Sequence, residues 1–319
     1  MNNTFTTYLE SQGKSKSTVI AYSSYALDFI SYLDADHTTC PDFSGEVENA
    51  TAKEVLSYLN HLQKKGQENK TRNIRLNVIK QFFNWQIEQG QRADNPIVHL
   101  KIRGTKQQKL YPILSKQELE ELYNTYEIPT DQHKKANCNW FAAYKLSKQR
   151  NKAILSLMIH QGLTTPEVER ITLNDLKLKQ GLLYVAGSRK SNERTLELKS
   201  VQIMALMEYQ YTTRKQLLHY NHPEEKRLFL AVPTVGKLAA TGVENLQIWK
   251  GLTNEIKKQH PKFINFKQVR TSVITHWLKQ YNLRQVQHMA GHRYVSSTER
   301  YLVNQTEDLQ KDIDQFHPF

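Results

Sequence analysis

Apolar residues recur at helical spacing through most of the first hundred residues. Between residues 16 and 34 the recurring positions follow the period of an amphipathic helix. Thr51 and Glu54 form a capping-box signal in front of a second apolar stripe. A third helix is predicted over residues 70–89, with Gly90 as its end. The pattern therefore predicts a helical unit at the start of the chain.

A polar, basic stretch at residues 101–109 interrupts the apolar pattern and contains a glycine, as interdomain linkers do. Ser115 and Glu118 then form a second capping-box signal that opens a new helix. We place a domain boundary near residue 110. The predicted divisions are a helical domain over 1–100, a linker over 101–112, a second domain over 113–304 and a tail over 305–319.

In one segment of the second domain, the spacing of apolar residues changes from a helical period to alternation. Around Gly181 and the polar turn at 187–193, apolar residues between 176 and 198 alternate, which predicts a β-meander. Elsewhere the spacing predicts helices, while residues 127–150 have no clear period. The helices are expected over 150–161, from about Pro166, and over 200–215, 243–259, 266–280 and 283–290. The fold class is therefore mainly α with a small β-meander.

The formal net charge of +13, from 44 Lys and Arg against 31 Asp and Glu, favours nucleic acid or an anionic membrane as partner. The membrane alternative is disfavoured, because no run of about 18 apolar residues exists and the mean hydropathy is −0.66. The first residues also lack the basic flank and apolar core of a signal peptide. Duplex DNA is the expected partner.

Only two cysteines occur, Cys40 and Cys138, and they are far apart with no metal-ligand spacing. This usage fits a reducing, cytoplasmic compartment and excludes a structural zinc site of the usual spacing. We expect neither a metal nor another cofactor.

The positive charge is concentrated between residues 51 and 110, whereas the preceding forty residues are rich in acids. Basic side chains at the start of the helix over 70–89 are placed to meet DNA phosphates or a major groove. The alternative is a solvated helix face. The candidate DNA-binding residues are Lys70, Arg72 and Arg75 on the helix, and Lys101, Arg103, Lys106 and Lys109 in the linker.

The most informative motif lies near the end of the chain, where Gly291-His292 is followed nine residues after the histidine by Tyr301. Arg270 stands on the predicted helix upstream. A tyrosine with a pKa of about 10 is a weak nucleophile unless it is deprotonated or the phosphate is activated. A guanidinium fork can hold two phosphate oxygens, and a histidine can assist proton transfer. Tyr294, which is nearer to His292 in the sequence, is a second candidate for the nucleophile. The alternative for Tyr301 is a tyrosine that only packs in the core.

At these residues the chain resembles the tyrosine recombinases, the phage-integrase and Xer-like site-specific recombinases, over nearly its full length. The resemblance implies a helical core-binding domain and a mixed α/β catalytic domain that form a C-shaped DNA clamp. It also implies a covalent 3′-phosphotyrosine intermediate without metal or nucleotide. The segments that carry it are Thr18–Tyr22, Asn69–Arg75, Phe82–Trp85, Asp94–Ile97, Leu114–Leu119, Gly162–Leu176 and Gly291–Tyr301.

The resemblance assigns roles residue by residue. Tyr301 would be the nucleophile, and Arg270 and His292 would bind the phosphate. A lysine in the β-hairpin turn of the family protonates the leaving oxygen. Here this is Lys190, with Arg189 as a competitor because the turn is about one residue longer. Lys267 stands where the family usually has a histidine.

One departure concerns the first catalytic box, which usually reads Gly-Leu-Arg. Here it reads Gly162-Leu163-Thr164, so the first phosphate-clamping arginine is absent. Losing such a contact is expected to slow cleavage by about two to three orders of magnitude. The candidate substitutes are Arg189, Lys267 and Arg170.

The sequence as a whole predicts a site-specific recombinase or integrase of a mobile element. By resemblance it works as a homotetramer on paired DNA sites, with an accessory DNA-bending protein as a further partner and the tail docking on a neighbouring subunit. Two alternatives remain. One is a DNA-binding protein that has lost catalysis with the arginine, and the other is a relaxing type IB topoisomerase, which Lys267 favours.

Overall fold

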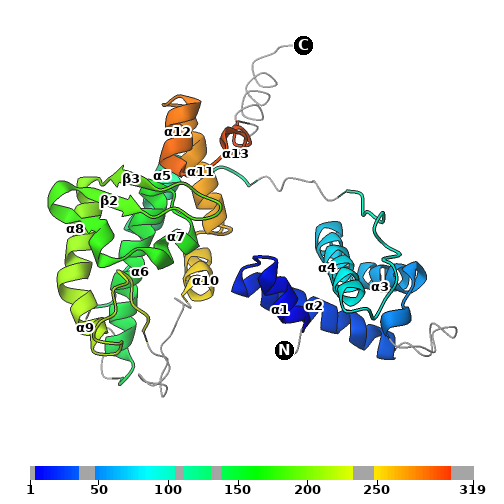
Figure 1. Cartoon of the computed structure of the whole chain (residues 1–319). Helices are drawn as coiled ribbons and strands as arrows, with labels where there is room; N and C mark the ends of the chain where they lie inside the picture. The colour runs from blue at the N-terminus through cyan, green and yellow to red at the C-terminus, as the bar shows by residue number, and fades with distance from the viewer. Residues whose placement is uncertain are drawn as a thin grey trace, which may run out of the picture. The chain divides into compact units, whose positions relative to one another are not determined.

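The structure, a computed structural model, describes residues 4–35, 47–104, 111–130, 132, 138–232 and 248–302. The chain divides into two compact units, residues 1–109 and 110–319 (Figure 1). The predicted tail over 305–319 lies outside the described residues, as do Cys40, Lys106 and Lys109. Among the helices that the structure describes, none is both long and apolar enough to cross a membrane.

The first unit consists of helices joined by turns and loops, and its described part contains no strand. Thr51 and Glu54 form the expected capping box, and Gly90 follows the last helix with a φ of 70°. The helices meet in one core that includes Leu9, Phe29 and Phe83. The elements are α1 (Phe5–Ser11), α2 (Lys16–Ala35), the 3-10 turn η1 (Val47–Asn49), α3 (Ala52–Lys64) and α4 (Asn69–Glu88).

The second unit contains the remaining helices of the described residues and the sheet. Its helices are α5 (Lys116–Asn124), α6 (Phe141–Gln161), α7 (Thr165–Arg170), α8 (Ser200–Glu208), α9 (Arg214–Leu218), α10 (Trp249–Gln259), α11 (Phe266–Leu278), α12 (Leu283–Ala290) and α13 (Val295–Glu299). The 3-10 turns η2 (Leu173–Asp175) and η3 (Leu178–Gln180) flank the first strand, and the π-helical turn η4 (Tyr209–Thr213) joins α8 to α9.

The predicted β-meander is confirmed. It consists of β1 (Leu176–Lys177), β2 (Leu182–Val185) and β3 (Arg194–Glu197), which pair antiparallel in that order. Leu183 lies opposite Leu196, and Val185 lies opposite Arg194. Because side chains alternate along a strand, Arg194 and Leu196 share the buried face of β3.

Helix α6 begins at Phe141, about nine residues before the predicted start at 150. The prediction was wrong there because α6 is buried on nearly all sides and includes the charged residues Lys148 and Arg150. Lys148 forms an ion pair with Glu255, and Arg150 donates to the Leu230 carbonyl oxygen. Charged residues that find partners inside a protein break the hydrophobic period without breaking the helix.

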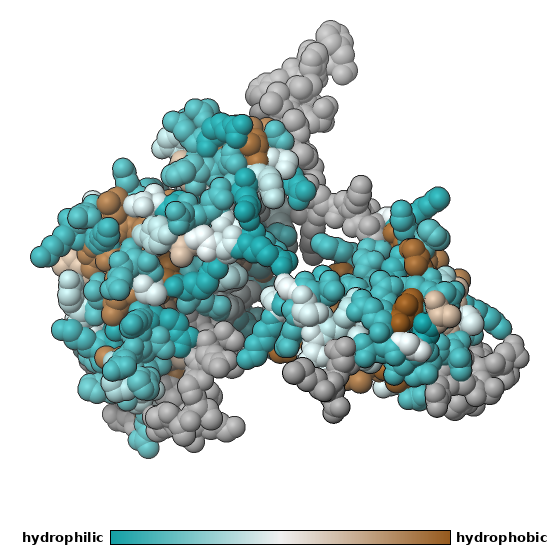
Figure 2. Space-filling view, viewed as in Figure 1, coloured by the Kyte–Doolittle hydropathy of each residue, from teal (hydrophilic) through white to brown (hydrophobic). Residues whose placement is uncertain are grey.

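Helix α6 lies at the centre of the second unit and packs against α5, α8 and α11, while α11 also packs against α12, and α12 against α13. In Figure 1 the last three helices follow one another at one end of this unit. The viewed face of each unit is mostly hydrophilic, with scattered apolar residues (Figure 2). The candidate motif lies along this succession of packed helices, from α11 through α12 to the segment after α13.

Candidate active site

The first catalytic box forms the junction between α6 and α7. Gly162 ends α6 in the left-handed region, with φ at 57°. Thr164 caps α7, and its backbone N–H and Oγ1 donate to Glu167 Oε2 at 2.8 and 2.9 Å. The capping contacts turn the Glu167 carboxylate inward, where the residue is 3% exposed. A threonine here thus starts the helix and fixes a buried negative charge.

Arg270, on α11, ties this junction to the end of α12. Its Nη1 donates to the Gly162 carbonyl oxygen at 2.5 Å, and its Nη2 donates to the Ala290 carbonyl oxygen at 2.7 Å. Nη1 also lies 3.7 Å from Glu167 Oε2. With 11% of its side chain exposed, the guanidinium retains only a narrow opening to solvent. These contacts fix its plane before any ligand arrives.

His292 follows Gly291, which ends α12 in the left-handed region with φ at 68°. The ring nitrogen Nε2 lies 3.2 Å from Arg270 Nη2, and Nδ1 lies 2.9 Å from Thr298 Oγ1. An arginine can only donate, so Nε2 accepts and Nδ1 carries the proton. Burial and the charges of Arg270 and Arg194 lower the pKa of His292 to about 4, although Glu167 opposes them. The imidazole is therefore neutral near pH 7.

This low pKa predicts how stability depends on pH. The histidine has a reference pKa of 6.5 and a folded pKa of about 4, so between these values the unfolded chain binds the proton more readily. His292 therefore destabilises the second unit as pH falls from about 6.5 towards 4. When the pH is lowered from 7 to 5 in thermal melts, the melting temperature of His292→Asn should fall less than that of the wild type. An equal loss in both proteins would contradict the buried, neutral imidazole.

Tyr301 lies just beyond α13, with its backbone N–H bonded to the Thr298 carbonyl oxygen at 3.0 Å. Its ring stacks on His292, with centroids 5.7 Å apart and planes 13° apart. Burial lowers the pKa of Arg270, whereas Glu167 and Tyr301 raise it, the tyrosine also through a side-chain hydrogen bond. The structure thus brings Tyr301, His292 and Arg270 together. Tyr294 is exposed.

The hairpin turn between β2 and β3 contacts the same segment through its backbone. Ser191 forms an isolated β-bridge with His292, and the Asn192 N–H donates to the Gly291 carbonyl oxygen at 3.0 Å. Arg293 Nη1 donates to the Arg189 carbonyl oxygen at 3.1 Å. The side chains of Arg189 and Lys190 are exposed, so both cations stand on a turn that is docked beside His292.

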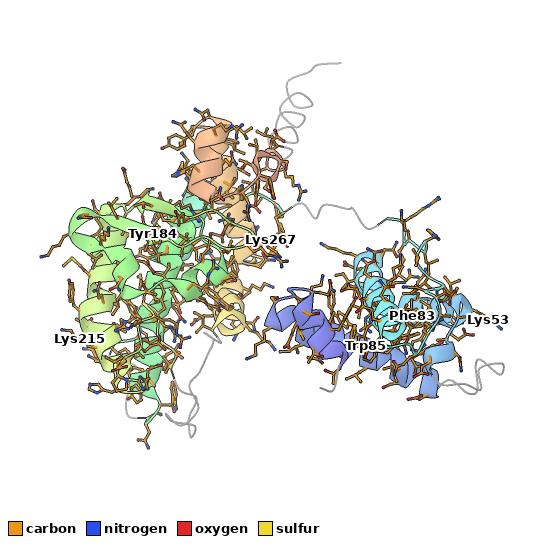
Figure 3. The ribbon with its side chains drawn as sticks, in the orientation of Figure 1. Lys53, Phe83, Trp85, Tyr184, Lys215 and Lys267 are labelled. Carbon is orange, nitrogen blue, oxygen red and sulfur yellow. The ribbon has the colours of Figure 1, made fainter. Side chains whose placement is uncertain are left out.

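Lys267 is exposed one helical turn before Arg270 on α11 (Figure 3). Its Nζ lies 5.7 Å from the centroid of the Tyr111 ring. Arg170, considered above as a substitute, is exposed and donates through Nε to the Pro166 carbonyl oxygen at 3.2 Å. Among the described residues, neither side chain forms a hydrogen bond or an ion pair with Glu167, Arg270 or His292.

Sequence reasoning missed Arg194 and Glu167. Arg194 Nη1 donates to Glu167 Oε1 at 2.7 Å, and the arginine side chain is 0% exposed. Burial alone would raise the pKa of the Glu167 carboxyl, but the hydrogen bond and charge of Arg194 and the charge of Arg270 hold it at about 2. The sequence did contain a signal for Arg194, because this arginine lies two residues before Leu196 on the buried face of a predicted strand.

The basic residues of the first unit differ in their surroundings. Lys70, Lys101 and Arg103 are exposed. Arg72 is only 8% exposed, and its Nε donates to the Leu59 carbonyl oxygen at 3.0 Å. Arg75 pairs with Asp28 and donates to the Tyr58 hydroxyl at 2.6 Å.

The Arg72 guanidinium is thus buried within the unit, whereas that of Arg75 is partly buried, and both join helices of the unit. The helical spacing from Lys70 could not reveal this, because the partners Leu59, Asp28 and Tyr58 come from α2 and α3.

No group of three or more His, Cys, Asp or Glu side chains suited to a metal occurs in the described part of the chain. The described site contains two guanidiniums, a carboxylate, a neutral imidazole and a phenol. This set suits an anionic, phosphate-like ligand beside Tyr301.

The model of the phage integrase family matches residues 112–308, and that of the phage integrase N-terminal SAM-like domain matches residues 1–92. The chain therefore belongs to the phage integrase family, the tyrosine recombinases, whose members bind, cleave and rejoin DNA. The resemblance seen in the sequence is confirmed at this level.

The chain is similar to the tyrosine recombinase XerD of Listeria innocua serovar 6a, with 24% identity over 314 residues, 96% of this chain and 94% of the relative. The solved structure of the XerH site-specific recombinase bound to difH substrate, a pre-cleavage complex, has a TM-score of 0.63 and 16% identity, covering 89% of this chain and 76% of that one. A lambda integrase tetramer bound to a Holliday junction has a TM-score of 0.57 and 15% identity, covering 93% and 74%. These similarities confirm the expected tyrosine recombinase fold.

Proposed function

We propose that this chain is a site-specific recombinase that cuts and rejoins duplex DNA through a covalent 3′-phosphotyrosine at Tyr301. The observation that carries the proposal is the assembly of Tyr301, His292 and Arg270 at the ends of α11, α12 and α13. The phenol stands beside a guanidinium whose plane is already fixed by two carbonyl oxygens. Such preorganised donors stabilise the charge that develops on a phosphate during transfer.

In the proposed cleavage, Tyr301 Oη forms a bond to the scissile phosphorus, and the 5′ oxygen leaves with the electron pair of the broken P–O bond. His292 Nε2 accepts a hydrogen bond from Arg270 Nη2 and orients that guanidinium, and the phenolic proton passes to solvent as the O–P bond forms. Arg270 neutralises the non-bridging oxygens. The 3′ phosphate stays on the enzyme, and attack by another strand's 5′ hydroxyl reverses the reaction.

Lys190 is the proposed acid that protonates the leaving 5′ oxygen. It extends from a turn whose backbone is held beside Gly291 and His292 by Asn192 and Ser191. This placement supports delivery of an exposed ammonium to the reacting phosphate. Arg189, on the same turn, remains the alternative donor, while Lys267 is proposed to bind the phosphate from the preceding turn of α11.

In the proposed domain plan, the helical unit over 1–100 binds DNA and the unit over 113–304 carries the chemistry, with the linker over 101–112 between them and the tail over 305–319 docking on a neighbour. Exposed Lys70, Lys101 and Arg103 would contact the DNA backbone, together with the linker lysines Lys106 and Lys109. The lambda integrase tetramer on a Holliday junction supports a homotetrameric assembly, and membership of the phage integrase family supports a role in a mobile element.

The test begins with a DNA site. The Tyr301→Phe protein, which keeps the fold but lacks the nucleophile, is used to select bound sequences from a random duplex library. The selected duplex is then nicked beside the scissile position, so that the cleaved fragment diffuses away and the covalent product accumulates. The wild type should give a protein–DNA adduct that survives denaturing electrophoresis, and Tyr301→Phe should give none.

Two other results would point to the rival functions. Tight binding of the selected duplex without an adduct would indicate a DNA-binding protein that no longer cuts. Relaxation of supercoiled DNA without sequence preference would indicate a type IB topoisomerase. The recombinase predicts an adduct that depends on both the selected sequence and Tyr301.

A further inference from the structure

Arg194 is a buried cation with incomplete hydrogen bonding. It begins β3, and its side chain enters the interior of the second unit with 0% exposure. Nη1 donates to Glu167 Oε1, but Nε and Nη2 have no hydrogen-bond partner among the described residues. A buried N–H group without an acceptor is costly, so Glu167 offsets only part of the cost of burying this cation.

The guanidinium lies directly against the peptide that leads into His292. A Cβ built on Gly291 would stand 2.2 Å from Arg194 Nη1 and 2.8 Å from Cζ. Only a glycine therefore leaves room for this side chain at the end of α12. The charge of Arg194 is also felt at the imidazole, where it acts with burial and Arg270 to lower the pKa of His292.

The charges of the cluster favour an anion. Glu167 is shared by Arg194, at 2.7 Å from Oε1, and Arg270, at 3.7 Å from Oε2. One carboxylate thus faces two guanidiniums, while His292 is neutral. Without Arg194 the carboxylate would cancel the charge of Arg270. With it the buried cluster keeps a net positive charge, which acts strongly in surroundings of low dielectric.

We propose that Arg194 takes the place of the arginine that is absent at residue 164, so that β3 supplies the second guanidinium charge for the scissile phosphate. The inference rests on the proposed function. Thr164 has no charge to offer but, as the cap of α7, it holds Glu167 in the orientation that receives Arg194. The three substitutes considered from the sequence, Arg189, Lys267 and Arg170, are all exposed.

The decisive experiment compares two substrates. One is the nicked, selected duplex, and the other is the same duplex with a methylphosphonate at the scissile position, which removes the negative charge of a non-bridging oxygen. Arg194→Gln keeps a donor for Glu167 but loses the charge. On the ordinary phosphate it should form adduct about 100- to 1,000-fold more slowly than the wild type. On the methylphosphonate most of this deficit should disappear, because there is less charge to neutralise.

Matched variants separate the charge from the fold. Arg194→Lys, which keeps the charge without the planar fork, should lie between the wild type and Arg194→Gln. The Glu167→Gln/Arg194→Gln double variant removes both buried charges together. If the single variant does not fold, the two substrates are compared with this double variant instead. Arg227→Gln, which breaks the pair between Arg227 and Glu225 in the same unit, should cleave both substrates as the wild type does.

Two results would overturn the inference while leaving the proposed function intact. The first is a folded Arg194→Gln that cleaves the ordinary phosphate at the wild-type rate. The second is a folded variant that binds the duplex yet stays equally slow on the methylphosphonate, which would make Arg194 a purely structural residue. If the wild type itself forms no Tyr301-dependent adduct, the proposed function fails instead.

Discussion

Replacing Arg270 by alanine is expected to slow formation of the covalent adduct by about 100- to 1,000-fold, the usual cost of removing a preorganised donor to a developing anion. The guanidinium is the group that joins the phenol of Tyr301, the imidazole of His292 and the ends of α6 and α12. Single-turnover cleavage of the nicked duplex measures the effect directly. Arg270→Lys should retain part of the rate, since it keeps a charge but loses the bidentate fork.

The same substitution should also destabilise the second unit. Each charge-assisted hydrogen bond that is lost, to the Gly162 and Ala290 carbonyl oxygens, is worth about 1.5–3 kcal/mol, and a buried carboxylate loses one of its two cations. Binding of the selected duplex and the melting temperature are therefore measured beside the rate, with Arg227→Ala as the arginine control. A folded Arg270→Ala that cleaves at nearly the wild-type rate would remove Arg270 from the proposed chemistry.

Among the described glycines, Gly291 is expected to show the largest effect of replacement by alanine. The backbone φ of 68° strains a residue other than glycine, at a cost of about 1–3 kcal/mol. The added Cβ would also overlap Arg194 Nη1 and Cζ, and overpacking of this kind costs about 1–3 kcal/mol more. To relieve the overlap the guanidinium must leave Glu167, so the adduct should form much more slowly as well.

Gly181→Ala is the matched control, because Gly181 has a similar φ of 67° in the same unit. Its nearest neighbour, at 3.3 Å, is the Cδ1 tip of Ile203, which can move aside. Gly181→Ala should lower the melting temperature modestly and leave cleavage unchanged. Equal losses of stability and of cleavage in both variants would show that backbone strain alone accounts for Gly291, and that its contact with Arg194 has no consequence.

Much of the fold follows from local signals that the sequence displays openly. The capping boxes at Thr51 and Ser115 begin α3 and α5 as predicted, and α12 runs over the predicted residues to Gly291. Such signals act within a few residues, so they can be read without knowing the rest of the molecule. Helix α6 was mispredicted because its buried charges are satisfied by residues far along the chain.

The candidate site likewise combines features that local patterns reveal with contacts between residues far apart in the sequence. The nine-residue spacing from His292 to Tyr301 brings the two rings into a stack, and Arg270 meets them from the preceding helix. Arg194 escaped attention because its partner Glu167 is 27 residues away, and only the folding of the hairpin onto α7 joins them. Arg72 and Arg75 also have partners on other helices, and a local pattern cannot reveal these contacts.

Thr164 illustrates how a departure from the family pattern can be informative. The sequence alone suggested a weakened enzyme, because an uncharged residue stands where the family has an arginine. In the structure the threonine orients Glu167, and Glu167 holds a guanidinium that arrives from β3. We therefore expect cleavage at a rate that a site with two arginines can support.

The chemical identity of the covalent link tests the central claim most directly. The adduct trapped on the nicked duplex is digested with protease and nuclease, and the modified peptide is sequenced by mass spectrometry. We predict a nucleotide joined through its 3′ phosphate to Tyr301, in the peptide that follows Arg300. An adduct on Tyr294, a link through a 5′ phosphate, or an adduct that persists in Tyr301→Phe would contradict the proposed mechanism.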